Sequence, residues 1–255
     1  MADKIVIDAG HNGLNDPGAV YNGRRESDDV LRLAMAVGEI LSRNGYEVAY
    51  TRTGDINQSV TQKANFANDA DADLMISIHR NMATYPGQYN GVQTLLYDQE
   101  GIKQPMAERI NQNLEGLGFR NIGIDLRPNL AVLRRTEMPA LLLEVGFIDS
   151  DTDNQLFDSR FQEIAQAIAD GIMDTLSAAD DDDSEDDASR YSYRPSYLTN
   201  PQATSFSTWT PDPPQSQPTP PLYRVQVGAF HNLQNAIELE QELKLLGYNT
   251  WIVTV

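Results

Sequence analysis

The stretch IVIDAGHNG, residues 5–13, sets the pattern of the chain, because a run of branched apolar residues ends there at a histidine between glycines. A run this short is typical of a buried strand, and Gly10 and Gly13 allow a ligand or another backbone to approach closely. A second run, LMISIHRN over residues 74–81, ends in the same way at His79. One such histidine is more often a hydrogen-bonded strand-end residue than a functional one. Two of the three histidines at such ends favour a functional site.

The rest of residues 1–176 alternates between strand-like and helix-like segments. Strands are predicted at YEVAYTR, GVQTLLY, LAVLRR and ALLLEVGFI, which are residues 46–52, 91–97, 130–135 and 140–148. Helical spacing of apolar residues predicts helices over residues 26–46, 106–118 and 160–176. This alternation predicts an α/β fold, with a twisted, mixed or mostly parallel sheet that has helices on both faces.

The first predicted helix carries sequence signals at both ends. Ser27 is expected to cap its start, and Asp28 and Asp29 suit the positive end of the helix dipole. Gly45 is expected to end the helix.

The composition changes abruptly after residue 176. Residues 177–221 are acidic and then proline-rich, which predicts a semi-extended linker without a core of its own. Residues 222–255 return to a strand, helix and strand pattern. A unit of this size has little core and leaves strand edges unpaired, so we expect it to form a homodimer through residues 222–255. The predicted divisions are therefore residues 1–176, 177–221 and 222–255.

Charge and composition exclude several classes of partner and site. The formal net charge of −18 argues against binding to nucleic acid or to an anionic membrane surface. With no cysteine in the chain, a metal site would have to use His, Asp and Glu. No apolar run is long enough for membrane insertion. The start MADK lacks the basic and apolar pattern of a signal peptide, which predicts synthesis in the cytoplasm without an export signal.

Four ionisable residues are candidates for one site. His11, His79 and Glu144 each follow or end an apolar run, and ligands of open α/β sheets collect at the carboxyl ends of strands. Glu26 opens the first helix, just beyond the loop that follows His11. Two imidazoles and one carboxylate form a zinc site of the catalytic type, and the other carboxylate could then act as the base.

Both carboxylates also have structural explanations. Glu144 could form a buried ion pair with Arg134 or Arg135, since an isolated buried charge is costly. Glu26 could be an acid that interacts with the helix dipole. The residues alone leave these alternatives open.

Four segments in order resemble the zinc-dependent N-acetylmuramoyl-L-alanine amidases of the amidase_3 family, over about residues 3–176. They are IVIDAGHNGLNDPGA, Glu26 after its loop, ISIHRN, and LRRTEMPALLLEVGFIDSDTD. The resemblance implies that His11, Glu26 and His79 bind zinc and that Glu144 is catalytic. The chain departs from the family pattern at D-A-G-H-N-G, where D-P-G-H-G-G is common. It departs again at Arg80, where a small residue is usual, and both departures bear on specificity.

The tail YRVQVGAFHNLQNAIELEQELKLLGY resembles half of a SPOR module, a peptidoglycan-binding repeat. Together the two resemblances imply an amidase that cleaves peptidoglycan between the lactyl group of N-acetylmuramic acid and L-alanine. The arrangement is similar to that of sporulation amidases that lyse the mother-cell wall, acting at the wall after release. Alternatives are a phage endolysin with the same activity, a zinc peptidase acting on the stem peptide, and an inactive wall-binding protein.

Overall fold

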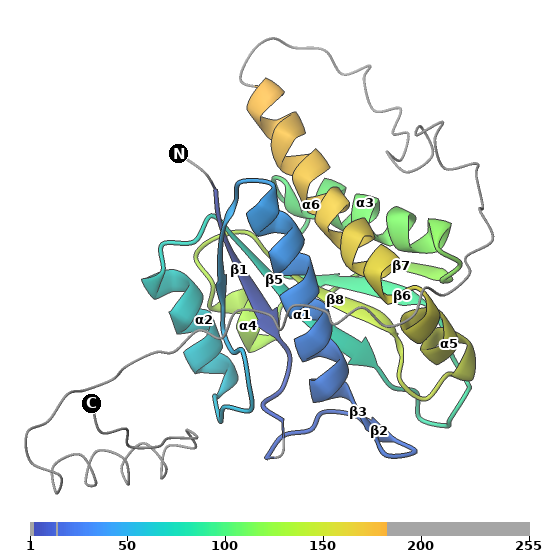
Figure 1. Cartoon of the computed structure of the whole chain (residues 1–255). Coiled ribbons are helices and arrows are strands. Elements are labelled where there is room, and N and C mark those ends of the chain that lie inside the picture. Colours follow the sequence, from blue (N-terminus) through green and yellow to red (C-terminus); the bar gives the residue numbers. More distant parts are fainter. Residues whose placement is uncertain (1–2, 14, 183–255) are drawn as a thin grey trace, which may run out of the picture. The chain divides into compact units, whose positions relative to one another are not determined.

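A six-stranded sheet in the order β4-β1-β5-β8-β6-β7 lies at the centre of residues 3–13 and 15–182, the residues that the computed structural model describes (Figure 1). Its strands pair in parallel, except that β6 runs antiparallel to β8. The predicted mixed, mostly parallel sheet is confirmed. The strands are β1 (Lys4–Ala9), β4 (Glu47–Tyr50), β5 (Leu74–Asn81), β6 (Val92–Leu96), β7 (Asn121–Leu126) and β8 (Ala140–Phe147). A separate antiparallel pair joins β2 (Val20–Tyr21) to β3 (Arg24–Arg25).

Helices cover both faces of the sheet. On one face α1 (Glu26–Arg43), α3 (Lys103–Gly116) and α6 (Phe161–Asp182) pack together, as Figure 1 shows. The other face carries α2 (Val60–Asp69) and α4 (Ala131–Arg134), and α5 (Asp151–Ser159) leads from β8 to α6. On β1, Ile5 and Ile7 belong to the first core, whereas Val6 between them belongs to the second. Because both faces are buried, the central strands are continuously apolar in sequence.

The start of α1 differs from the prediction that Ser27 caps it. The N-cap is Arg25, two residues before Ser27, and the helix begins at Glu26. The Oγ of Ser27 is buried and has no hydrogen-bond partner among the described residues. The first N–H groups of the helix donate instead to the preceding loop, from Glu26 to the Ala19 carbonyl and from Ser27 to the Pro17 carbonyl. Carbonyl groups of the loop backbone therefore accept the hydrogen bonds that a capping side chain accepts in other helices.

The end of α1 agrees with the prediction. Gly45 has a φ of 95°, in the left-handed region that favours glycine. Its N–H donates to the Ser42 carbonyl, and the N–H of Tyr46 donates to the Leu41 carbonyl. These two bonds form a Schellman motif, so Gly45 ends the helix as expected.

The strand predicted at residues 130–135 is wrong, because this segment holds the helix α4, Ala131–Arg134. A short apolar run has no periodicity that separates a strand from a helical turn, and Val132 and Leu133 are buried in the second core. The strand in this region is β7, whose sequence NIGIDL is only partly buried and holds a glycine. Two helices, α2 and α5, were not predicted, although the capping box of Ser59 and Gln62 marks the start of α2. Helix α6 continues through Asp182, past the predicted boundary at residue 176.

The predicted linker lies beyond the described residues except for its first residues, and the predicted module and dimer contact at residues 222–255 lie wholly outside them. None of the helices that the structure describes is long and apolar enough to cross a membrane.

Candidate metal centre

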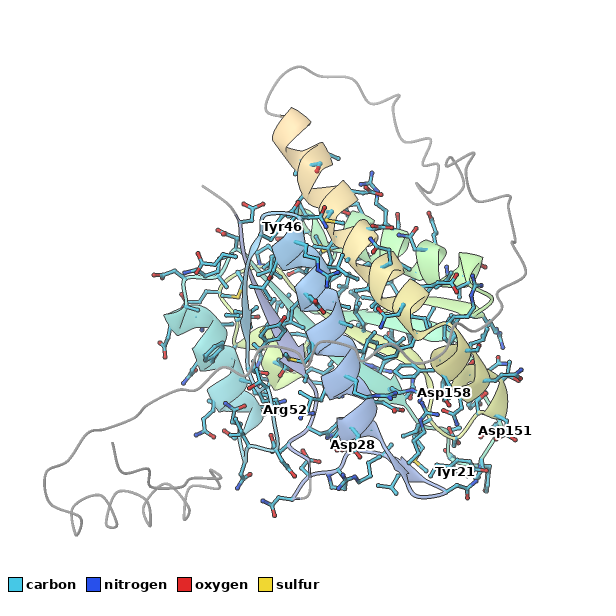
Figure 2. All side chains as sticks on the ribbon, viewed as in Figure 1. Tyr21, Asp28, Tyr46, Arg52, Asp151 and Asp158 are labelled. Atoms are coloured by element: carbon cyan, nitrogen blue, oxygen red, sulfur yellow. The ribbon has the colours of Figure 1, made fainter. Side chains whose placement is uncertain are left out.

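The His11 loop follows β1 and is held by two buried cations. His11 has a φ of 61°, an uncommon conformation for a residue with a side chain. The Lys63 ammonium donates to the carbonyls of Ala9, at 2.7 Å, and His11, at 2.9 Å. The Arg52 guanidinium, labelled in Figure 2, donates to the carbonyls of Ala9, at 3.0 Å, and Gly10, at 2.7 Å. Charge-assisted bonds of this kind can maintain an otherwise unfavourable backbone conformation.

The charge of Lys63 is balanced by Asp8, which is buried on β1. Their side chains approach to 3.0 Å, and the hydroxyls of Thr51 and Ser77 each donate to the Asp8 carboxylate at 2.6 Å. Burial alone would raise the pKa of Asp8, but Lys63 and the two hydroxyls outweigh it and lower the pKa. Burial lowers the pKa of Lys63 despite the nearby carboxylate. The His11 loop therefore rests on a buried, hydrogen-bonded ion pair.

Glu26, the first residue of α1, lies between the two histidines. Its Oε1 is 2.9 Å from His79 Nδ1 and accepts the backbone N–H of Arg80 at 3.0 Å. Its Oε2 is 3.0 Å from His11 Nε2 and accepts the backbone N–H of Ala19 at 2.9 Å. Burial raises the pKa of Glu26, but its bonds to the histidines outweigh burial and hold the pKa well below its usual range. This carboxylate is therefore ionised and fixed at both oxygens.

A second carboxylate orients the His11 ring. The Nδ1 of His11 donates to Asp16 at 2.9 Å, which leaves Nε2 directed toward Glu26. Burial lowers the pKa of His11, but the bonds and charges of Glu26 and Asp16 outweigh burial and raise it. A carboxylate on the far nitrogen is the usual partner of a metal-binding histidine. Sequence reasoning missed Asp16, although its position five residues after His11 in the same loop was a usable signal.

The structure brings His11, Glu26 and His79 together, with one ligand atom from each lying within 4.8 Å of the others. Glycines make room for these side chains. A Cβ at Gly18 would lie 2.5 Å from the His11 ring and 2.6 Å from Glu26 Oε2, and one at Gly10 would lie 2.5 Å from the His79 ring. Two imidazoles and one carboxylate fit the three-ligand zinc sites of hydrolases. The donor set and the glycine packing thus both suit a zinc ion.

Glu144 lies on β8, in register with His79 on β5. Its Oε2 is shielded from solvent and accepts no hydrogen bond from the described residues. Burial raises the pKa of Glu144 to about 7, with Glu26 adding to the effect and the two histidines opposing it. The alternative of an ion pair with Arg134 or Arg135 is wrong, since no cation among the described residues pairs with Glu144. A carboxyl group with this pKa can both accept and donate a proton near neutral pH.

Arg80 is part of the support of the site. Its side chain is fully buried, pairs with Asp29 of α1 at 2.6 Å and lies 4.4 Å from the centre of the Phe157 ring. It also donates to the carbonyls of Val145 and Phe147 on β8. Arg80 therefore connects β5, α1 and β8 from a fully buried position beside His79.

Comparison with known proteins separates the chain into two matched regions. Residues 5–174 match the Amidase_3 family, described as N-acetylmuramoyl-L-alanine amidase. Residues 203–255 match the SPOR domain family. The second match begins before residue 222, within the segment predicted as a linker.

Similar proteins come from bacteria and from a phage. The endolysin of Bacillus phage SPP1 is 36% identical over 185 residues, covering 69% of this chain and 67% of the endolysin. The sporulation-specific N-acetylmuramoyl-L-alanine amidase of Bacillus subtilis (strain 168) is 30% identical over 256 residues, covering 98% of this chain and 84% of that protein.

Solved structures of the same kind match the described part of the chain. The catalytic domain of the amidase CwlV from Bacillus (Paenibacillus) polymyxa var. colistinus is 34% identical with a TM-score of 0.62. An N-acetylmuramoyl-L-alanine amidase from Clostridium difficile 630 is 29% identical with a TM-score of 0.65. Each match covers 69% of this chain and 98% of the other chain.

Proposed function

Because the chain belongs to the Amidase_3 family of N-acetylmuramoyl-L-alanine amidases, we propose that it is a zinc-dependent amidase of peptidoglycan. It cleaves the amide between the lactyl group of N-acetylmuramic acid and L-alanine. The observation that carries the zinc dependence is the approach of ligand atoms from His11, Glu26 and His79 to within 4.8 Å of one another.

In this proposal the three residues hold zinc and Glu144 moves the proton. Zinc, when bound, supplies Lewis-acid polarisation of a carbonyl group and acidifies water. Glu144 takes a proton from the attacking water as the water oxygen bonds to the lactyl carbonyl carbon. It then delivers that proton to the alanine nitrogen as the carbon–nitrogen bond breaks, which leaves a lactyl carboxylate and a free amine. Its pKa of about 7 suits both transfers.

Product analysis on purified peptidoglycan tests the reaction. The amidase releases lactyl carboxyl ends and peptides that begin with L-alanine. A zinc peptidase acting on the stem peptide would create new peptide ends without free lactyl groups, and an inactive wall-binding protein would create neither. Metal analysis after zinc reconstitution, with activity before and after chelation, tests the metal: one zinc per chain is expected.

We further propose that residues 203–255 bind the chain to the wall. The sporulation-specific relative aligns over 98% of this chain, whereas the phage endolysin aligns over 69%, which favours a bacterial wall amidase over a phage endolysin. Sedimentation with purified walls tests this proposal. The full chain should bind more tightly than a chain ending at Asp182, where α6 ends. Equal binding by both would overturn the targeting role.

Pairing of residues 222–255 across two chains remains a prediction. A 34-residue module has a small core, whereas a module that begins at residue 203 has more chain from which to build one. Light scattering of the full chain at tens of micromolar is the test, and a monomer there would refute it.

A further inference from the structure

A polar cavity of about 350 Å³ lies at the end of the sheet that carries the candidate metal centre. Three segments line this cavity: Tyr21 on β2, the loop 86–90 after β5, and residues 149–152 after β8. Tyr21 and Asp151, from two of these segments, are labelled at this end of the molecule in Figure 2. Each lining segment is close in sequence to a residue of the candidate metal centre. Tyr21 lies between His11 and Glu26, and the other two segments follow the strands that hold His79 and Glu144.

Hydrogen bonds connect two of the segments that line the cavity, so these segments are held in place by the fold. The backbone N–H of Gly87 donates to the Asp149 carbonyl at 3.0 Å. The buried Asp149 carboxylate accepts the N–H of Ala83 at 3.2 Å. The loop after β5 is thereby tied to the turn after β8, directly beyond the paired ends of the two strands.

Tyr89 is one of the residues that line this cavity, and it contacts two neighbouring residues. Its ring centre lies 6.1 Å from that of Phe147, three residues after Glu144, and its hydroxyl accepts from the Gln88 amide at 3.2 Å. Tyr89 is nevertheless 51% exposed, so the residue is accessible to a ligand. Contact with Phe147 connects this ring to the strand of the candidate catalytic residue.

The lining suits a neutral, hydroxylated ligand. It combines the rings of Tyr21 and Tyr89 with the amides of Gln88 and Asn90 and the Asp151 carboxylate. Tyrosine rings pack on the apolar face of a sugar, and amides and carboxylates bond to hydroxyl and acetamido groups. None of the described lining residues is Lys, Arg or His, so an anionic peptide segment would meet carboxylates without a compensating cation. The volume lies within the range of small-molecule sites.

We propose that this cavity is a subsite for an N-acetylated sugar of the glycan strand. The enzyme then binds a sugar ring beside the lactyl amide that it cleaves. This inference rests on the proposed amidase function and adds a glycan requirement to it.

The test compares two substrates that share one peptide: a muropeptide with its N-acetylated sugars, and the same peptide carrying only the lactyl group. Tyr89→Ala should lower kcat/KM on the muropeptide by about tenfold, the scale of one lost ring contact. On the lactyl peptide it should change nothing. Tyr89→Phe keeps the ring and should stay close to wild type on both substrates. Tyr85→Ala is the matched control, because Tyr85 is an exposed tyrosine near the same loop that does not line the cavity.

Other outcomes overturn the proposal. Equal losses on both substrates would make Tyr89 a support of Phe147, and no loss on either would leave the cavity without a role. A loss that depends on peptide length would assign it to the stem peptide. If wild type cleaves neither substrate, the proposed function fails. Calorimetry with the trimer of N-acetylglucosamine then still tests whether the cavity binds a sugar. Binding weakened about tenfold by Tyr89→Ala supports it, and identical binding or none refutes it.

Discussion

Glu26 at the start of α1 and Glu144 on β8 lie at the same end of the sheet, yet their surroundings drive their pKa values in opposite directions. Burial raises the pKa of both carboxyl groups. At Glu26 the bonds and charges of two histidines outweigh burial. Two backbone N–H groups also donate to Glu26, whereas Glu144 has an oxygen without a partner among the described residues. The number of donors around a buried carboxylate, more than its burial, therefore decides whether it suits a metal or a proton.

The two regions are also positioned by different forces. The ligand region depends on buried charges, since Lys63 and Arg52 hold the carbonyls of the His11 loop. Glu144 depends on backbone pairing, because its residue is in register with His79 on β5 and Gln93 on β6. Substitutions of charged groups should therefore affect the ligand region more than Glu144.

The largest effect is expected from Glu26→Gln. An amide loses the negative charge that balances the metal and the two histidines, so zinc affinity should fall by more than the ~10- to 100-fold typical of changes to outer-shell partners. Hydrolysis should disappear with the metal. Zinc titration of the metal-free variant measures this, and retained stoichiometric zinc at wild-type affinity would contradict the assignment of Glu26 as a ligand.

Glu144→Gln should separate chemistry from metal binding. The amide can neither accept nor deliver a proton, and turnover should fall by ~10²- to 10⁴-fold, the usual contribution of general acid–base catalysis. Zinc content should stay close to wild type. Loss of zinc in this variant would make Glu144 a ligand, and unimpaired turnover would assign the base to another group.

Lys63→Met tests the ion pair beneath the His11 loop. Removing the ammonium leaves Asp8 charged and buried, which should cost about 3–5 kcal/mol in the free energy of unfolding. Urea unfolding of the metal-free chain measures it. The control is Asp8→Asn combined with Lys63→Met, which removes the unpaired charge and should recover part of the loss. If the double variant is no more stable than Lys63→Met, the unpaired charge of Asp8 is not the cause.

The sequence predicted those parts of the site that depend on local pattern. His11, His79 and Glu144 stand out because each interrupts or ends a buried strand, and the fold brings the first two to Glu26 as expected. Their roles as ligands and base remain predictions. The supporting role of Lys63 could not be recognised from the sequence. The His11 carbonyl that it binds lies 52 residues away, and a lysine in a helix is usually exposed to solvent.

Arg80 illustrates the same difficulty on the other side of the site. In the sequence it is a departure beside His79, whereas in the fold it is a buried partner of Asp29. The strand prediction for residues 130–135 failed for a different reason. The burial of Val132 and Leu133 in a helical turn depends on packing against α2. Long-range partners decide both cases, and a single sequence does not reveal them.

The smallest effect is expected in the pH dependence of stability of the metal-free chain. Glu144 has a pKa of about 7 in the folded protein against an ordinary value of 4.5. A raised carboxyl pKa stabilises the fold fully below pH 4.5, and this contribution is lost as pH rises from 4.5 through 7, because the unfolded chain releases the proton first. At most about 3 kcal/mol is involved. Glu26 has the opposite sign, since its lowered pKa favours the fold above pH 4.5 and loses that contribution as pH falls.

Chemical unfolding of wild type and Glu144→Gln between pH 4.5 and 8 isolates this contribution. His11, whose pKa is raised, also loses stabilising effect as pH rises, so the wild-type slope alone does not identify Glu144. The difference between the two proteins does, because His11 is common to both. We expect Glu144→Gln to become more stable relative to wild type by about 1–3 kcal/mol over this range. Parallel curves would mean that Glu144 keeps an ordinary pKa, and the contrast with Glu26 would then rest on hydrogen bonding alone.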